Sequence, residues 1–340
     1  MLIVHLEPGL SDMALRREHS TFPLDLQGLH FSAGDATRAD WLVIVQYVSS
    51  AVVTSVPRQR RILVITEPTG VFPSSYINQF GVLVSPFNVL AFRGVWFQSH
   101  GALTSFFGLE FANKQARSTM DYQGLVTCPI PQKRDSISAV VSTKSVLPGH
   151  RDRLRFVQKL SAAIGPRLEL YGHGFRDIAD KSSAILPTKY HLVLENAVMP
   201  SFWTEKLADA YLGHALPIVS GPPDLGRWFP EASFVAIDIE DPSGAIEVIN
   251  RALNDDLYSQ RVDEIAEARK RVLRDERICP LIARVIASCA NTDPKLPVPE
   301  TILPLPRRPF LSRAAHEVAR IYWQVESRIS LRDLVRSRGS

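Results

Sequence analysis

The residues best placed to do chemistry lie where an apolar, strand-like segment passes into a helical one. The apolar segment His191–Leu194 is followed directly by Glu195 and Asn196, and a helical pattern opens at Thr204–Lys206. A second apolar segment, Leu216–Ser220, comes after that helix. This order predicts a β-α-β unit whose polar residues gather at the strand-to-helix connection. Ligands bind at that edge of a parallel sheet because helix N-termini and loop amides converge there.

The first turn of that helix has the residue types of an anion site. Thr204 or Ser201 can cap the helix, which leaves free amides and the positive end of the helix dipole directed at a ligand. Lys206 opposes the dipole, so a cation there is best explained by a bound anion such as a phosphate. Glu205 would be repelled by a phosphate and should face hydroxyl groups, such as a ribose diol. The alternative is a solvated Glu-Lys pair on an ordinary first turn.

Further candidate ligands follow two earlier strand-like segments. Lys144 ends one of them, and Arg153 lies in the first turns of the predicted helix Arg151–Ile164. A guanidinium can hold two phosphate oxygens at once, which makes Arg153 a candidate ligand for a diphosphate. Tyr171 and Gly172 end the next segment, and a glycine there permits close backbone approach to a ligand. The alternatives are a solvated basic face and a plain turn.

Taken together, these segments resemble one known family. The run from residue 195 to 221 is similar to the donor-binding core of the α-1,3/4-fucosyltransferases (glycosyltransferase family 10), whose pattern is F-E-N-S, D-Y-x-T-E-K, then P-x-x-x-G. Residues 149–157, GHRDRLRFV, resemble the G-H-x-x-R-L-x-F-V of its bacterial members. The similarity extends over about residues 133–250. It implies that a nucleotide-sugar donor contacts Lys144, Arg153, Tyr171, Gly172, Glu195, Asn196, Phe202, Thr204, Glu205 and Lys206.

Two departures from the family pattern concern the donor. The F-E-N-S of the family reads Leu-Glu-Asn-Ala at positions 194–197, and Ser-Phe at 201–202 stands where the family has D-Y. Phe202 lacks the tyrosine hydroxyl, which removes one polar contact to the donor. The resemblance therefore implies binding of a GDP-sugar more strongly than it implies fucose.

One carboxylate in the N-terminal half is a candidate general base. Glu67 follows the apolar segment Arg61–Thr66, and an inverting sugar transfer needs one base to take the proton of the acceptor hydroxyl. The family carries a glutamate in a similar place, which implies this role for Glu67. Partial burial at a cleft would raise its pKa, as a base needs. Glu7 also precedes a proline and is a rival candidate, and an ordinary loop glutamate is the remaining alternative.

Apolar segments alternate with amphipathic helical ones along most of the chain, which predicts an α/β fold with two parallel sheets. We expect an acceptor-binding Rossmann-like domain at 1–130, a donor-binding Rossmann-like domain at 131–290, and a proline-rich connector with a basic amphipathic helix at 291–340. The family resemblance implies a GT-B-like arrangement, in which the two domains face a cleft.

Composition and charge exclude several classes of protein. Of 340 residues, 45% are hydrophobic and 22% charged, and no apolar run approaches the roughly 20 residues that span a bilayer. We expect no signal peptide. Three scattered cysteines and nine histidines have no metal-binding spacing, so no metal ion is indicated. Residues 303–340 hold eight arginines and three acidic residues, so the net positive charge of this segment exceeds the net charge of +4 of the whole chain. The rest of the chain is therefore not basic, which argues against nucleic-acid binding by its folded domains. We expect the C-terminal helix either to dock on the N-terminal domain or to lie on an anionic membrane.

The family resemblance implies an inverting glycosyltransferase, and the composition favours a protein that is cytoplasmic or peripheral on the inner face of the membrane. The resemblance implies transfer of L-fucose from GDP-L-fucose to a hydroxyl of an oligosaccharide or lipid-linked glycan. Lipopolysaccharide synthesis or protein glycosylation would use such a reaction, with an α-1,3-type linkage and no cofactor beyond the donor. The alternatives are the same fold with another nucleotide sugar, and an inactive nucleotide- or glycan-binding module.

Overall fold

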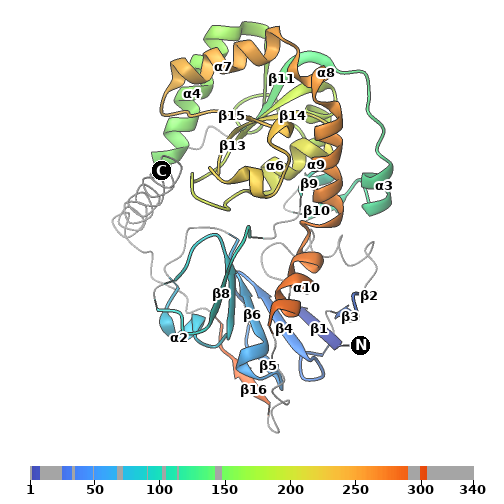
Figure 1. Cartoon of the computed structure of the whole chain (residues 1–340), viewed down its shortest axis with the longest axis vertical. Coiled ribbons are helices and arrows are strands. Elements are labelled where there is room, and N and C mark those ends of the chain that lie inside the picture. Colours follow the sequence, from blue (N-terminus) through green and yellow to red (C-terminus); the bar gives the residue numbers. More distant parts are fainter. Residues whose placement is uncertain are drawn as a thin grey trace, which may run out of the picture.

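The computed structural model describes residues 2–7, 25–32, 35–48, 50–66, 72–89, 91–101, 105–112, 115–141, 148–289 and 299–304. They form two main sheets, each packed with helices, and the two sheets lie one above the other along the long axis of the molecule (Figure 1). We call them the N-terminal sheet and the C-terminal sheet. The predicted α/β fold with two parallel sheets is thereby confirmed.

The N-terminal sheet is parallel except at one edge. Its strand order is β2 (Asp25–Leu26), β3 (Leu29–Ser32), β1 (Leu2–Glu7), β4 (Trp41–Val45), β6 (Arg61–Val64), β7 (Val82–Ser85) and β8 (Val95–Gln98). Only the edge strand β2 runs antiparallel to its neighbour in this sheet. Every residue of β4, β6 and β7 is buried, as expected of apolar strands that are covered on both faces.

The C-terminal sheet is wholly parallel. Its strand order is β12 (Leu168–Tyr171), β11 (Arg134–Val140), β13 (Thr188–Leu194), β14 (Leu216–Ser220) and β15 (Val235–Ala236). The longer helices that pack with it are α4 (Pro148–Ile164), α6 (Glu205–Leu212), α7 (Pro242–Asn254) and α9 (Val262–Arg274). One buried cluster joins sheet and helices, with Phe156 from α4, Tyr190 from β13 and Tyr211 from α6. This core fixes the end of β13 relative to the start of α6.

Two segments pack on the sheet of the other half of the chain. In α10 (Ile278–Ser288), Ile282 is buried with Val43 in the core of the N-terminal sheet. In the opposite direction, Phe107 and Leu125 are buried in the core of the C-terminal sheet. The predicted domain ranges differ from this packing. They assign α10 to the domain at 131–290, and they assign Phe107 and Leu125 to the domain at 1–130. Buried apolar contacts, and not chain order, decide which sheet a segment joins.

Shorter elements complete the described fold. The helices are α2 (Ser74–Ile77), α3 (Tyr122–Thr127), α5 (Ser182–Ile185) and α8 (Leu257–Gln260), and the antiparallel strand pairs are β9 (Leu109–Ala112) with β10 (Gln115–Ser118) and β5 (Val52–Thr54) with β16 (Glu300–Ile302). The β5–β16 pair ties residues 300–302 back to the N-terminal half.

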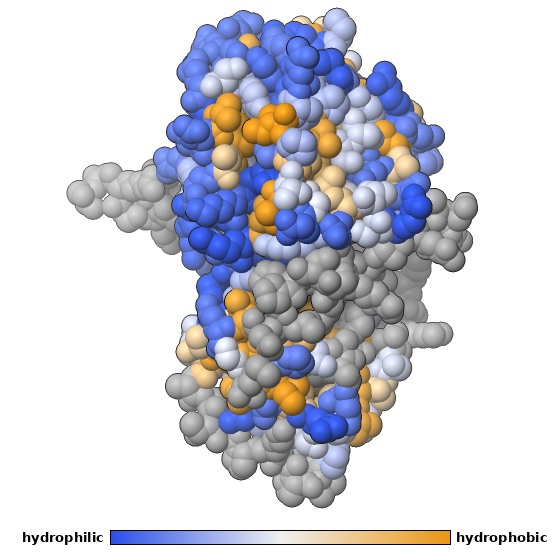
Figure 2. All heavy atoms as spheres, turned by 90° about the vertical axis from the view of Figure 1, so that its right-hand side faces the viewer, coloured by the Kyte–Doolittle hydropathy of each residue, from blue (hydrophilic) through white to orange (hydrophobic). Residues whose placement is uncertain are grey.

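Within the described ranges, the protein has no helix that is both long and apolar enough to cross a membrane. Figure 2 shows hydrophilic side chains over most of the visible face of the C-terminal half, with separate groups of hydrophobic side chains between them. The predicted amphipathic helix near the C-terminus lies outside the described residues, and its docking surface stays a prediction.

Two buried histidines predict that acid destabilises the protein. Burial, with nearby lysines, lowers the pKa of His191 to about 3, and burial, with the nearby Arg269, lowers that of His214 to about 4. Both are neutral when folded but take up a proton on unfolding below about pH 6.5, the ordinary histidine pKa. The free energy of unfolding should therefore fall as pH drops from about 6.5 to 4, by about 1.4 kcal/mol per pH unit for each histidine. Urea unfolding across this range measures the slope.

A substitution at His214 separates its contribution to the pH dependence from that of His191. His214→Asn removes the titrating ring, and asparagine also tolerates the left-handed backbone at φ 53°. It should flatten the pH slope relative to that of the unaltered protein. An unchanged slope would mean that His214 does not titrate as expected.

Candidate functional site

The predicted strand-to-helix connection is the place where α6 begins. Thr204 is the N-cap of this helix, and its hydroxyl oxygen accepts a hydrogen bond from the backbone N of Lys206 at 3.4 Å. Of the two cap candidates, Thr204 is therefore the one used. In Figure 1, α6 lies in the part of the C-terminal half that faces the N-terminal sheet. The amides of its first turn are thus directed toward the edge at which β13 and β14 end.

Glu195, the residue that follows β13, ties this turn to the sheet. Its side chain is 0% exposed. Its Oε1 accepts a hydrogen bond from the backbone N of Thr204 at 2.8 Å, and the Thr204 hydroxyl lies 2.8 Å from Oε2. The Nζ of Lys206 lies 3.3 Å from Oε2 and 3.1 Å from the Thr204 hydroxyl. Burial raises the pKa of Glu195, and the Lys206 ammonium opposes this effect. Glu195 therefore positions the cap and Lys206 from beneath the surface.

Arg153 reaches the same strand end from α4. Its Nη1 donates to the side-chain oxygen of Asn196 at 2.7 Å and lies 3.3 Å from the backbone oxygen of Leu194. Arg153 and Lys206 thus both bind groups at the carboxyl end of β13, although they come from different helices. Two cations and a helix N-terminus at one strand end can hold a diphosphate.

Glu205 lies between two ammonium groups. Its Oε1 is 3.5 Å from the Nζ of Lys206 and 3.9 Å from the Nζ of Lys181. Burial alone would raise the pKa of Glu205, but these two lysines lower it below its usual value. Its side chain is 11% exposed. An ionised carboxylate is therefore held beside Lys206 with part of its surface accessible, as a group that binds hydroxyls requires.

Phe202 is not available as a donor contact. It is 1% exposed and packs in a core on the N-terminal sheet that includes Tyr76 and Phe80. Met199, from the same loop, is buried in that core as well. The prediction that Phe202 binds the donor is therefore wrong, because its ring anchors the loop between β13 and α6 to the N-terminal half.

Tyr171 and Gly172 have contacts that differ from those expected. The Tyr171 hydroxyl donates to Glu169 Oε2 at 2.7 Å and accepts from Arg176 Nη1 at 3.3 Å. Gly172 has φ 103°, and a Cβ at this position would lie 2.2 Å from the backbone oxygen of Val141. Glycine is thus required by the close approach of two backbone segments. These contacts explain both residues without a ligand, so their assignment to the donor site gains no support.

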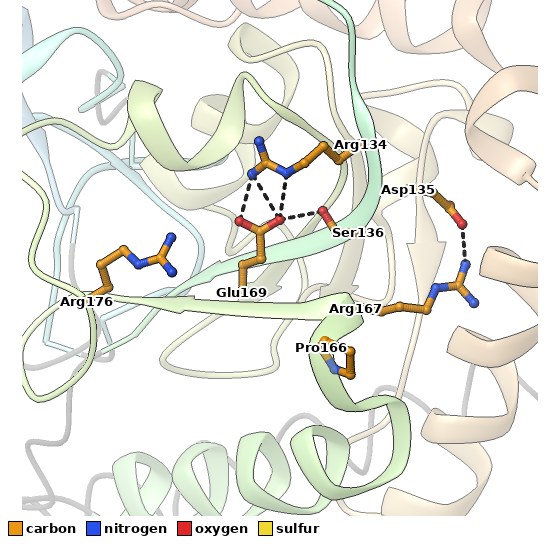
Figure 3. A pocket seen from close by; sticks show the side chains of 7 residues that line it. All are labelled: Arg134, Asp135, Ser136, Pro166, Arg167, Glu169 and Arg176. Atoms are coloured by element: carbon orange, nitrogen blue, oxygen red, sulfur yellow. Dashed lines mark hydrogen bonds and ion pairs between the residues drawn. The ribbon is translucent and has the colours of Figure 1, made fainter.

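A hollow of about 590 Å³ lies near the starts of strands β11 and β12 (Figure 3). Its lining residues are Arg134, Asp135, Ser136, Pro166, Arg167, Glu169 and Arg176. Figure 3 shows Arg134 turned onto Glu169 and Arg167 turned onto Asp135, with closest N–O distances of 2.7 Å in each pair. Because these charges are matched within the protein, we assign this hollow no part in the donor site.

The N-terminal sheet presents an ordered strand end next to the predicted base. Thr66, which precedes Glu67, is 5% exposed. Its backbone N and its hydroxyl both donate to the Gln46 side-chain oxygen, at 2.7 and 2.9 Å. A Cβ on Gly101 would come within 2.5 Å of the Thr66 Cα, so the chain after β8 presses directly on this strand end. Glu67 itself lies outside the described residues, as does Lys144, and both assignments stay predictions. The side chain of Glu7 is likewise not described.

A stacked pair of rings connects this strand end to α6. His100, adjacent to Gly101, stacks on Trp203 with 4.2 Å between ring centroids. Its Nε2 lies 2.9 Å from Glu276 Oε2, and burial lowers the pKa of His100. Because Trp203 directly precedes Thr204, this contact holds the end of the N-terminal sheet against the first turn of α6.

Sequence reasoning missed Lys181, Asp209 and His100. Lys181 and His100 lie in loops without a recognisable pattern. Asp209 had one usable signal, because an acidic residue one turn after Glu205 falls on the same side of an amphipathic helix. Asp209 is 0% exposed, and it binds Lys181 at 2.7 Å and the backbone N of Phe107 at 2.8 Å. No group of three or more His, Cys, Asp or Glu residues that could hold a metal ion occurs in the described ranges.

Comparison with known proteins identifies the region that contains this site. Residues 130–259 match a family model described as glycosyltransferase family 10 (fucosyltransferase), C-terminal part. This match confirms the resemblance to family 10 over these residues.

Curated relatives match the same part of the chain. The 4-galactosyl-N-acetylglucosaminide 3-alpha-L-fucosyltransferase 9 of Bos taurus is 31% identical over 122 residues, which are 34% of this chain and 32% of the relative. The Homo sapiens protein of the same name is 30% identical over 121 residues, again 34% of this chain and 32% of the relative. The aligned region thus spans about a third of the length of these curated relatives.

Two proteins of known structure align with most of the chain. An alpha1,3-fucosyltransferase aligns with a TM-score of 0.47 and 16% identity over 80% of this chain and 90% of its own. An alpha,alpha-trehalose 6-phosphate synthase from Burkholderia multivorans aligns with a TM-score of 0.42 and 10% identity over 74% of this chain and 73% of its own.

Proposed function

Because residues 130–259 match the C-terminal part of glycosyltransferase family 10, we propose that this protein is an inverting fucosyltransferase. It moves L-fucose from GDP-L-fucose to a hydroxyl of a glycan acceptor. One observation carries the proposal: inside the matched region, at the carboxyl end of β13, hydrogen bonds join Arg153 to Asn196 and join Glu195 to both Thr204 and Lys206.

The diphosphate of the donor is the anion that suits this cluster. Arg153 offers N–H donors, Lys206 offers an ammonium group, and the start of α6 offers backbone amides. As the bond between fucose and GDP breaks, negative charge grows on the departing diphosphate, and these fixed groups stabilise it electrostatically. The ionised Glu205 would bind the ribose hydroxyls, which carry no charge to repel it.

The proton of the acceptor hydroxyl passes to Glu67 in this proposal. The acceptor oxygen forms its bond to the anomeric carbon while the bond from that carbon to GDP breaks on the opposite side, which inverts the configuration. The order around Thr66 supports this assignment, because Gln46 and Gly101 hold the strand end from which Glu67 follows. The contact of His100 with Trp203 places that strand end against the donor half.

The acceptor is proposed to be a surface glycan. The name of the mammalian relatives describes action on a 4-galactosyl-N-acetylglucosaminide, with fucose added at position 3. By that likeness we propose an oligosaccharide or lipid-linked glycan, such as that of lipopolysaccharide, and an α-1,3-type linkage. The arginine-rich residues 303–340 would either dock on the N-terminal domain or hold the enzyme on the anionic inner face of the membrane.

GDP should stabilise the protein well beyond UDP or ADP. A ligand that binds only the folded state at 100 times its dissociation constant raises the free energy of unfolding by about 2.7 kcal/mol. The melting temperature should therefore rise with saturating GDP and change little with UDP or ADP. Thermal-shift measurements with the three nucleotides check this, and equal shifts with all three would contradict the donor assignment.

A transfer screen then separates the enzyme from its alternatives. GDP-fucose, other GDP-sugars and UDP-sugars are each offered with galactosyl-N-acetylglucosamine acceptors, and the product linkage is analysed. We expect product with GDP-fucose and inverted configuration. Transfer from another GDP-sugar would indicate the same fold with a different donor. GDP binding without transfer or hydrolysis would indicate a binding module.

A further inference from the structure

Besides Lys206, a second lysine, Lys181, lies near the Glu205 carboxylate in the first turn of α6. Lys181 is the residue before α5, and its side chain is 22% exposed. Its Nζ binds Asp209 Oδ2 at 2.7 Å and lies 5.1 Å from the centre of the Phe106 ring. Because Asp209 is 0% exposed and also binds the backbone N of Phe107, the ammonium of Lys181 is held at a fixed place. From there it lies 3.9 Å from Glu205.

Lys206 lies near two carboxylates, which compete with any phosphate for it. Its Nζ is 3.3 Å from Glu195 and 3.5 Å from Glu205. A phosphate that draws Lys206 toward itself leaves both carboxylates with less compensation, and a buried carboxylate without a partner is costly. Glu195 would keep the backbone N and hydroxyl of Thr204. The group that would remain beside Glu205 is Lys181.

We infer that Lys181 is a positioning residue for the donor: it holds the Glu205 carboxylate and thereby leaves the Lys206 ammonium available to the diphosphate. This inference rests on the proposed function, since it concerns the same donor. Lys181 itself touches no reacting atom. It acts through Glu205, while Asp209 sets its place.

The test is a double-mutant cycle on GDP affinity, measured by calorimetry. Lys181→Met should weaken GDP binding about tenfold, because neighbouring charges in one network couple strongly. In a Glu205→Gln background the neutral amide no longer competes for Lys206, so the same Lys181→Met change should have almost no further effect. Lys181→Arg, which keeps the positive charge, should restore most of the affinity.

A second variant guards against misfolding. Lys181→Met leaves the buried Asp209 without its ammonium partner, whereas Lys181→Met combined with Asp209→Asn removes both charges and keeps an oxygen for the Phe107 amide. This pair should show the same loss of GDP affinity. The control is Lys189→Met, which breaks an ion pair of similar length, 2.8 Å, with the more exposed Asp256 elsewhere in the C-terminal half and should leave GDP binding unchanged.

Kinetics supply a readout that general loss of structure would not give. The KM for GDP-fucose should rise about tenfold in Lys181→Met and kcat should also fall, because the Lys206 ammonium stabilises the departing diphosphate as well. Lys181→Arg, which keeps the positive charge, should restore both constants. Equal losses of GDP affinity in the presence and absence of Glu205 would overturn the inference. Unchanged affinity in the Lys181→Met, Asp209→Asn pair would overturn it as well. Absence of GDP binding by the unaltered protein would instead contradict the proposed function.

Discussion

Turnover should fall by roughly 10²–10⁴-fold when Glu67 is replaced by glutamine, the usual contribution of a positioned general base. The amide keeps the shape of the side chain and part of its hydrogen bonding, but it accepts no proton from the acceptor hydroxyl. GDP affinity should stay nearly constant, because the donor groups Arg153, Glu205 and Lys206 lie in the other half of the chain. The measurement is fucose transfer at saturating donor, with GDP titration of the same preparation.

Glu7→Gln is the matched control for this experiment, since Glu7 also ends a strand of the N-terminal sheet and precedes a proline. Its effect on turnover should be mild. Loss of turnover in Glu7→Gln with normal turnover in Glu67→Gln would move the base to Glu7. Near-normal turnover in both variants would contradict a glutamate base at either strand end.

Removing either cation of the proposed diphosphate site should weaken GDP binding by about 1.5–3 kcal/mol, the range for charge-assisted hydrogen bonds. Arg153→Ala and Lys206→Met are the two variants, and calorimetric titration with GDP measures the loss. The same variants should lower transfer from GDP-fucose, because both groups also stabilise the departing diphosphate. Unchanged affinity in both would mean that the two cations form only a basic surface.

The two variants should differ in stability. Arg153 binds Asn196 and the backbone at Leu194, so its loss removes hydrogen bonds to neutral groups. Lys206→Met takes the ammonium from the buried Glu195, so the free protein should lose stability. Combining Lys206→Met with Glu195→Gln should restore part of it. Arg155→Ala, on the exposed part of α4 where Arg155 pairs with Asp152, is the control that should change neither quantity.

Local features of the sequence were sufficient to predict which polar groups of the proposed donor site lie side by side. The apolar segment at 191–194, the polar pair at 195–196 and the helix that opens at 204 are consecutive, and a β-α-β unit brings the end of a strand next to the start of its helix. The polar groups predicted there, Glu195, Asn196 and the first turn of α6, are therefore neighbours in the structure. Arg153 joins them because α4 begins above the same edge of a parallel sheet.

Tertiary structure alone decided the roles of several other residues. Phe202 follows the sequence pattern of a ligand-binding position, yet its ring is buried against the N-terminal sheet. The hydrophobic effect is not directional, so an aromatic side chain in a loop can pack in a hydrophobic core as readily as against a ligand. Gly172 is comparable, because a close approach by Val141 and a close approach by a ligand require the same residue type.

The charges around Glu205 depended on the fold in the same way. Lys181 reaches Glu205 and Asp209 from a loop before α5, and His100 reaches Trp203 from the other half of the chain. Periodicity reports which residues share a face of one element, but it carries no information about which elements meet. The sequence thus determined the strand ends and the first turn of α6, because these features arise from residues that are neighbours along the chain. The packing of distant segments brought Lys181 to the carboxylates of α6 and brought His100 to Trp203, which holds the start of α6 against the N-terminal sheet.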